Sequence, residues 1–268
     1  MHGPLTSIEG KKKRKRFSAA ARDRVLTVVS PVVVLSIWQC ASQMGLMDAR
    51  FVPSPVSIAT AAVRLTQSGE LWTHISISLW RLSLGFIVGA VPGFLIGLLM
   101  GLSRWARAIL DPLVSATYPI PKIAILPLIM LLFGVGEASK VAIIAIAVVY
   151  LVLLNTMTGV MTIDRIYFDV AKNYGASWRK TFTRLIFPAS LPLIFAGLRL
   201  SIGVALIVIV SAEFLAAKAG IGYLIWTSWE TLVIENMFVG LIVITVLGVV
   251  ATAILRELEQ ALVPWRRE

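Results

Sequence analysis

Two stretches of this chain, residues 82–102 and 141–160, contain no charged residue. Each is about as long as the ~20 apolar residues that a helix needs to cross a bilayer. Backbone amide and carbonyl groups find no water at that depth, so a crossing segment must satisfy its own backbone, as a helix does. With 58% hydrophobic residues among 268, the chain is predicted to be an all-α, multi-pass membrane protein.

Four further segments have the composition of membrane spans: residues 25–42, about 112–134, within 185–217, and 237–255. We therefore predict six transmembrane helices in one domain, residues 25–255, with a basic tail at 1–24 and a second tail at 256–268. The basic run at 11–16 before an apolar segment is also a feature of signal peptides. That segment is long, contains Pro31 and lacks a clear cleavage site, so we interpret it as an uncleaved first span.

The formal net charge is +11, and its distribution indicates topology rather than nucleic-acid binding. If the N-terminus lies inside, eighteen Lys and Arg residues fall in the inner segments and four in the outer segments. Positive residues are enriched on the cytoplasmic side of membrane proteins. Both termini are therefore predicted to be cytoplasmic, and no nucleic-acid partner is expected.

The charge-free segment 82–102 carries a glycine at every fourth position. Such a row lies along one ridge of a helix and lets a second backbone approach closely. The row drifts by about 40° per step, because four residues exceed one turn of 3.6, so it suits a neighbour that crosses at an angle. We predict tight helix packing, rather than direct chemistry, for Gly85, Gly89, Gly93, Gly97 and Gly101.

Two segments on the predicted outer side are expected to form short structures at the membrane interface. Ser54 followed by Pro55 is a typical helix start, with serine as the N-cap and proline in the first turn. Residues 219–236 contain Trp226 and Trp229, and tryptophan is enriched at the level of the lipid headgroups.

The third predicted span contains Pro119, Pro121 and Pro127, which an unbroken helix cannot accommodate without losing hydrogen bonds. Broken backbone inside a membrane is tolerated beside protein or a water-filled cavity, so this span is predicted to line a pathway. Lys122 either faces that cavity or extends to the cytoplasmic headgroups.

Two polar residues in other spans are weaker pathway candidates. A glutamate at position 213, in the fifth span, indicates either a hydrogen bond to a neighbouring helix or a place in the pathway or gate. For Asn155 in the fourth span, an interhelical hydrogen bond is expected before a ligand contact. The residues predicted to lie nearest to the pathway are Pro121, Lys122, Asn155 and Glu213.

Motifs for catalysis are absent from the sequence. It contains neither a P-loop nor an H-E-x-x-H pattern, and its two histidines, His2 and His74, offer little for metal or histidine chemistry. An ion-coupled transporter would show paired intramembrane acids and inverted repeats, and we find neither. We predict a subunit with no catalytic residue, metal or cofactor of its own.

The longest predicted cytoplasmic loop contains Asp169-Val170-Ala171, three residues, Gly175, nine residues and then the sequence LIFP. This resembles the EAA loop of ABC-importer permeases, E-A-A-x3-G-x9-I-x-L-P, with four mild departures. Residues 109–140, 197–203, 211–214 and 220–225 resemble the nitrate, sulfonate and taurine branch, and the resemblance covers roughly residues 50–265. Where that branch often has a second proline after PIP, this chain has Lys122.

The resemblance implies the type I importer (MetI-like) fold, with a cytoplasmic coupling helix at about residues 164–176. Asp164 is a suitable N-cap for it, and Gly175 permits a left-handed stop. Apolar side chains at helical spacing give it a face that needs a partner, unless the helix lies on the membrane. The residues assigned to ATPase coupling are Tyr167, Asp169, Val170, Ala171, Tyr174 and Gly175.

The resemblance also implies partners and a place in the bacterial inner membrane. A second permease copy, in a homodimer, would complete the pathway, and two ABC ATPase subunits would carry the ATP and Mg. A periplasmic or lipid-anchored substrate-binding protein would dock near residues 48–80 and 218–234. The expected solute is a small nitrate-, sulfonate- or taurine-like anion; the alternatives are a vitamin precursor such as a pyrimidine or, with less support, an ion-coupled transporter.

Overall fold

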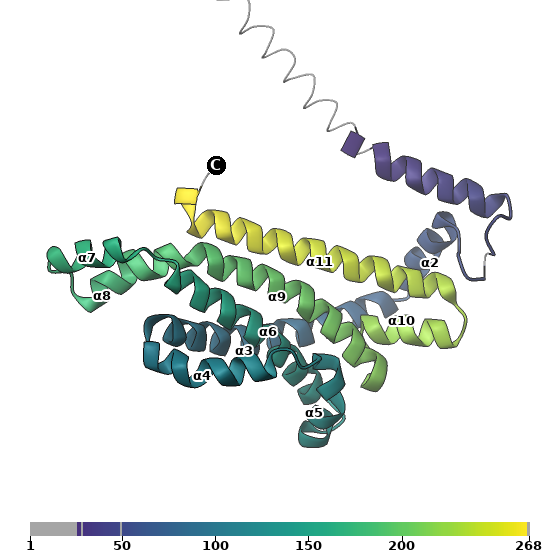
Figure 1. Ribbon diagram of the computed structural model, residues 1–268. Helices are drawn as coiled ribbons and strands as arrows, with labels where there is room; N and C mark the ends of the chain where they lie inside the picture. The colour runs from purple at the N-terminus through teal and green to yellow at the C-terminus, as the bar shows by residue number, and fades with distance from the viewer. Residues whose placement is uncertain (1–25, 28, 49, 267–268) are drawn as a thin grey trace, which may run out of the picture. The chain divides into compact units, whose positions relative to one another are not determined.

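The computed structural model describes residues 26–27, 29–48 and 50–266, which form helices joined by turns, without a β-strand (Figure 1). The chain divides into two units, Met1–Val63 and Arg64–Glu268. In the first unit a helix occupies residues 29–43, and the N-terminal part of α2 (Pro55–Gln67) follows. The Ser54 hydroxyl accepts the Ser57 N–H at 3.1 Å, which confirms the predicted N-cap. The predicted basic tail at 1–24 lies outside the described residues.

The second unit is a bundle of four long helices: α3 (Glu70–Leu102), α6 (Glu137–Met161), α9 (Phe187–Ala216) and α11 (Ile234–Leu262). In the described part of the chain, four helical segments are long and apolar enough to cross a membrane, and a bent pair adds a fifth if it counts as one span. The predicted all-helical membrane class is confirmed, while the described residues do not reach the predicted count of six.

Helix α6 lies at the centre of this unit, with α3 on one side and α9 on the other (Figure 1). Ile143, Ile144, Val148 and Val152 of α6 are completely buried, and Ile209 of α9 packs into the same core. Arg199 of α9 forms an ion pair with Glu259, which attaches α11 to the bundle.

The glycine row of α3 lies directly against α6, as predicted. A methyl group on Gly93 would lie 2.6 Å from the carbonyl oxygen of Val149, and one on Gly85 would lie 2.7 Å from Cβ of Ile144. Real Cβ atoms essentially never approach other atoms this closely. The two backbones therefore approach closely because α3 presents hydrogen atoms, rather than side chains, along this ridge.

Several helices extend beyond the apolar stretches that predicted them. α3 begins at Glu70 rather than near Leu82, and α6 begins at Glu137 rather than Val141. α11 continues to Leu262, into the predicted C-terminal tail, and is followed by the short helix η3 (Pro264–Arg266). The hydrophobic stretches therefore predict the apolar middle of each helix. The helices are longer than these stretches because polar residues at their ends are also helical.

The predicted third span is broken, and it begins earlier than expected. Helix α4 (Arg104–Thr117) follows α3 after a single residue, and a short 3₁₀ turn η1 (Lys122–Ile125) leads into α5 (Leu126–Phe133). The two halves are bent by 87°. The break falls at Pro119 and Pro121, where the missing amide N–H groups prevent a continuous helix. The break is as predicted, and the basic segment 103–107, which lies before the predicted span, contains the start of α4.

Candidate functional site

One candidate site is the short helix α7 (Arg165–Asn173), which projects with α8 (Trp178–Thr181) at one end of the bundle (Figure 1). The Asp164 carboxylate accepts the Ile166 N–H at 3.0 Å and so caps the first turn. At the other end, the N–H of Ala176 donates to the carbonyl of Ala171, and the N–H of Gly175 donates to that of Lys172. This pair of bonds is a Schellman motif. Both predicted helix ends are therefore confirmed.

Gly175 stops the helix because its backbone has a φ of +65°, in the left-handed region that glycine adopts without strain. The chain then turns back through α8 and a π-helical stretch (Phe182–Ile186) into α9. Helix α7 is therefore capped at both ends by hydrogen bonds of its own.

The apolar face of α7 is uncovered in this chain. Exposed fractions are 60% for Ile166, 58% for Tyr167, 48% for Val170 and 87% for Tyr174. These positions lie within about 100° of arc on the helix, whereas Lys172 lies on the opposite side. Exposed apolar patches of this kind mark interaction surfaces. Among the other predicted coupling residues, Asp169 is exposed and Ala171 is partly buried.

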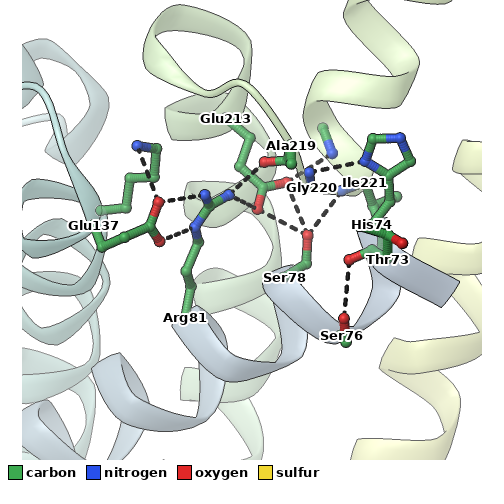
Figure 2. A network of polar contacts seen from close by, with 12 residues as sticks. Thr73, His74, Ser76, Ser78, Arg81, Glu137, Glu213, Ala219, Gly220 and Ile221 are labelled. Carbon is green, nitrogen blue, oxygen red and sulfur yellow. Dashed lines mark hydrogen bonds and ion pairs between the residues drawn. The ribbon is translucent and has the colours of Figure 1, made fainter. Parts of the chain in front are cut away.

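A second candidate site is a buried network of polar contacts at the opposite end of the bundle, around Arg81 (Figure 2). Its guanidinium bonds both oxygens of the Glu137 carboxylate, at 2.5 and 2.6 Å. Its Nη1 donates to Glu213 at 2.8 Å and to the carbonyl of Ala219 at 2.6 Å. Arg81 thereby joins α3, the start of α6, the end of α9 and the segment before α10 (Ile221–Glu230).

Glu213 is enclosed within this network, and its side chain is 0% exposed. The Ser78 hydroxyl donates to it at 2.8 Å, and the Gly222 N–H donates at 2.7 Å from the first turn of α10. The partial positive charge of a helix N-terminus favours a carboxylate at that place. Next to it, His74 Nδ1 accepts the Gly220 N–H at 3.0 Å, so that nitrogen carries no proton.

The four residues predicted for the pathway have separate surroundings. Lys122 bends back and donates to the carbonyls of Thr117 and Tyr118, at 3.2 and 2.9 Å, so it adds a donor to the backbone at the proline break. Its ammonium also lies 4.3 Å from the centre of the Tyr150 ring, a cation–π distance. The neighbouring Pro121 is exposed at the start of η1.

The interhelical hydrogen bond predicted for Asn155 is not found among the described residues of this single chain. Its amide donates to the carbonyl of Leu151, one turn earlier in its own helix, at 2.8 Å. The side chain faces α9 at a point of close approach, since a methyl group on Gly197 would lie 2.6 Å from its Cβ. At this point α9 has only the hydrogen atom of Gly197 and no side chain, so the Asn155 amide donates to a backbone carbonyl of its own helix.

Sequence reasoning did not single out Arg81, Glu137, Ser78 or His74. A signal was nevertheless present: Arg81 and Glu137 lie just outside two charge-free stretches, and a charge at the edge of a span either reaches water or finds a partner. Which partner it finds depends on which helices are neighbours, and that information comes from the fold.

Comparisons with known proteins agree with the membrane architecture. The family described as "Binding-protein-dependent transport system inner membrane component" matches residues 93–267. The putative aliphatic sulfonates transport permease protein SsuC of Bacillus subtilis (strain 168) is 35% identical over 98% of this chain and 95% of its own length. The protein of the same description from Escherichia coli (strain K12) is 36% identical, over 90% and 92%. The taurine transport system permease protein TauC of the latter organism is 30% identical, over 92% of each chain.

Proposed function

Because this chain belongs to the family of binding-protein-dependent transport system inner membrane components, we propose that it is the permease subunit of an ABC importer for a small sulfonate. It is a multi-pass inner-membrane transport subunit, related over nearly its whole length to permeases. The sulfonate is supported by relatives named for aliphatic sulfonates and for taurine, which is itself a sulfonate.

In this proposal α7 is the coupling helix, and its partner is a groove on an ABC ATPase that carries ATP and Mg. The observation that carries the assignment is the exposed apolar face on a helix with both ends capped. Burying one valine-sized side chain contributes about 1.5–3 kcal/mol, so four such residues supply a substantial interface. The proposed contacts are Tyr167, Asp169, Val170, Ala171, Tyr174 and Gly175.

We further propose that two copies of this chain form a homodimer, each with six spans and with both termini in the cytoplasm. The first span would lie at residues 25–42. If α7 is cytoplasmic, the Arg81 network lies at the outer end, because α6 and α9 run between the two sites (Figure 1). A substrate-binding protein would then dock near α10.

The pathway is proposed to run beside the broken span, near Pro121, Lys122, Asn155 and Glu213. The 87° bend supports this, since irregular backbone at membrane depth lies beside protein or a water-filled cavity. Glu213 would act there through Arg81, because its own carboxylate is enclosed.

The proposal is tested with the chain, its ATPase and its binding protein reconstituted in proteoliposomes. Taurine and an alkanesulfonate should each stimulate ATP hydrolysis and be taken up. Stimulation by a pyrimidine precursor alone would show that the substrate class is wrong. Uptake that needs an ion gradient and no ATPase would contradict the importer assignment.

The coupling helix is tested in the same preparation with two matched variants. Val170→Gln places an amide on the apolar face of α7, whereas Lys172→Gln places the same side chain on the opposite, exposed face. We expect Val170→Gln to weaken ATPase association by about tenfold or more, from the lost burial of an apolar side chain, and Lys172→Gln to behave like the wild type. Equal behaviour of the two variants would contradict docking through this face.

A further inference from the structure

A cavity of about 540 Å³ lies beside the Arg81 network, where α6 begins and α9 ends. Its lining includes three cationic side chains, Arg81, Lys140 and Lys218, and one carboxylate, Glu137. Glu213 stands behind Arg81 as a second carboxylate. Three positive charges against two negative ones leave one positive charge in this cluster without compensation.

Two of these cations are buried, unlike ordinary surface lysines. The side chains of Arg81 and Lys140 are each 3% exposed. Lys140 Nζ donates to the carbonyl of Gly136 at 3.0 Å and lies 3.9 Å from Glu137. A buried cation is costly unless an anion or several hydrogen bonds accompany it. The two buried cations are balanced by Glu137 and Glu213, so the uncompensated positive charge is that of the exposed Lys218 in the cavity lining, where it favours an additional anion.

The two carboxylates that hold Arg81 differ in how firmly they are held. Glu213 is 0% exposed and is also bonded by Ser78 and Gly222. Glu137 is 56% exposed, and its ion-pair partners are Arg81 and Lys140. Glu137 can therefore return to water at little cost, whereas Glu213 cannot, so Arg81 has one fixed and one exchangeable partner.

We propose that this cavity binds the sulfonate head group of the solute, which takes the place of the Glu137 carboxylate on Arg81. A sulfonate presents three acceptor oxygens. Two match the fork of a guanidinium in the same bidentate way as a carboxylate, and the third reaches the ammonium groups of Lys140 and Lys218. Gly136 and the N-terminus of α6 add a favourable partial charge. Trp80 and Ile77 in the lining face the apolar part of the solute.

That the anion is a sulfonate rests on the proposed function, whereas the inference of an anion site rests on the charges that line the cavity. In the proposed orientation the cavity opens at the outer end of the permease, directly after the end of α5. It gives the solute a first contact with the permease before it enters the pathway, and Glu137 acts as an internal competitor that prevents tight retention.

The test is direct calorimetric titration of the purified permease–ATPase complex in nanodiscs, without the binding protein. Methanesulfonate is the probe, and methanesulfonamide is the neutral control of similar shape. We expect methanesulfonate to bind and methanesulfonamide to bind at least about tenfold more weakly, since charge-assisted hydrogen bonds are roughly twice as strong as neutral ones. Equal affinities for the two, or binding of sulfate but not of methanesulfonate, would overturn the proposal.

Variants separate this site from other anion sites. Glu137→Gln removes the competing charge and should tighten methanesulfonate binding by about tenfold, because the displaced bidentate ion pair is lost. Lys218→Gln should weaken it by about threefold, the size expected for an exposed charge. Lys172→Gln, at the other end of the bundle, should leave it unchanged. If neither cavity variant alters binding while both complexes keep their ATPase and melting temperature, the site is wrong.

The two proposals can fail separately. Sulfonate uptake together with methanesulfonate binding that Glu137→Gln does not change would reject the cavity and leave the proposed function intact. Methanesulfonate binding that follows the variants, in a complex that takes up no sulfonate, would reject the proposed substrate and leave an oxyanion site whose solute is another anion.

Discussion

Replacing Arg81 by methionine is expected to destabilise the bundle more than replacing Glu213 by glutamine. Arg81→Met leaves the Glu213 carboxylate, 0% exposed, with the neutral donors of Ser78 and Gly222. Leaving a buried charge without its ionic partner costs about 3–5 kcal/mol. In Glu213→Gln, Arg81 keeps its bidentate contact with Glu137, and the lost charge-assisted hydrogen bond costs about 1.5–3 kcal/mol.

The assay is the melting temperature of the purified subunit, followed by fluorescence-detected size exclusion after heating. The single variant Glu213→Met and the double variant Arg81→Met/Glu213→Met complete a mutant cycle with Arg81→Met. Because the double variant leaves no unpaired charge at the centre of the network, it should recover much of the stability that Arg81→Met loses. If Arg81→Met has the melting temperature of the wild type, the reasoning is refuted. It is also refuted if the stability losses of the two single methionine variants add up in the double variant, because the two residues are then not coupled.

Gly93→Ala should lower the melting temperature, at an overpacking cost of about 1–3 kcal/mol, because its Cβ would lie 2.6 Å from the Val149 carbonyl oxygen; unchanged stability would contradict that contact. Lys122→Met should reduce the rate of uptake, because it loosens the bend, and should leave the half-saturating solute concentration unchanged. A higher half-saturating concentration in this variant would instead show that Lys122 contacts the solute. Reporter fusions after Gly69 and Glu268 should report opposite sides, the latter cytoplasmic; the same side for both would contradict the topology.

Features that depend on local chemistry could be predicted from the sequence. Asp164 and Gly175 define the ends of α7 because capping and left-handed backbone are properties of single residues. The glycines of α3 identify a packing ridge because their four-residue spacing is a property of the helix itself. The prolines at 119 and 121 predict a break for the same kind of reason.

Features that depend on neighbours could not be predicted. Arg81 and Glu213 are 132 residues apart in sequence, and nothing local in either residue indicates the other. The early starts of α3 and α6 follow from the same contacts, since a polar segment continues a helix inside the bundle where its charges are paired. The amide of Asn155 bonds the carbonyl of Leu151 in its own helix, at a point where Gly197 of the neighbouring helix lies close, and this depends on packing that the sequence does not show.

The central claim is that the apolar face of α7 docks on an ATPase subunit, and site-specific photo-crosslinking in cells tests it most directly. A photoreactive amino acid is placed at Tyr174, which is 87% exposed on the apolar face, or at Lys172, which is exposed on the opposite face. The account predicts a strong crosslink from position 174 to the ABC ATPase and a much weaker one from position 172. Equal crosslinks at both positions, or a crosslink from position 174 to lipid and not to the ATPase, would contradict it.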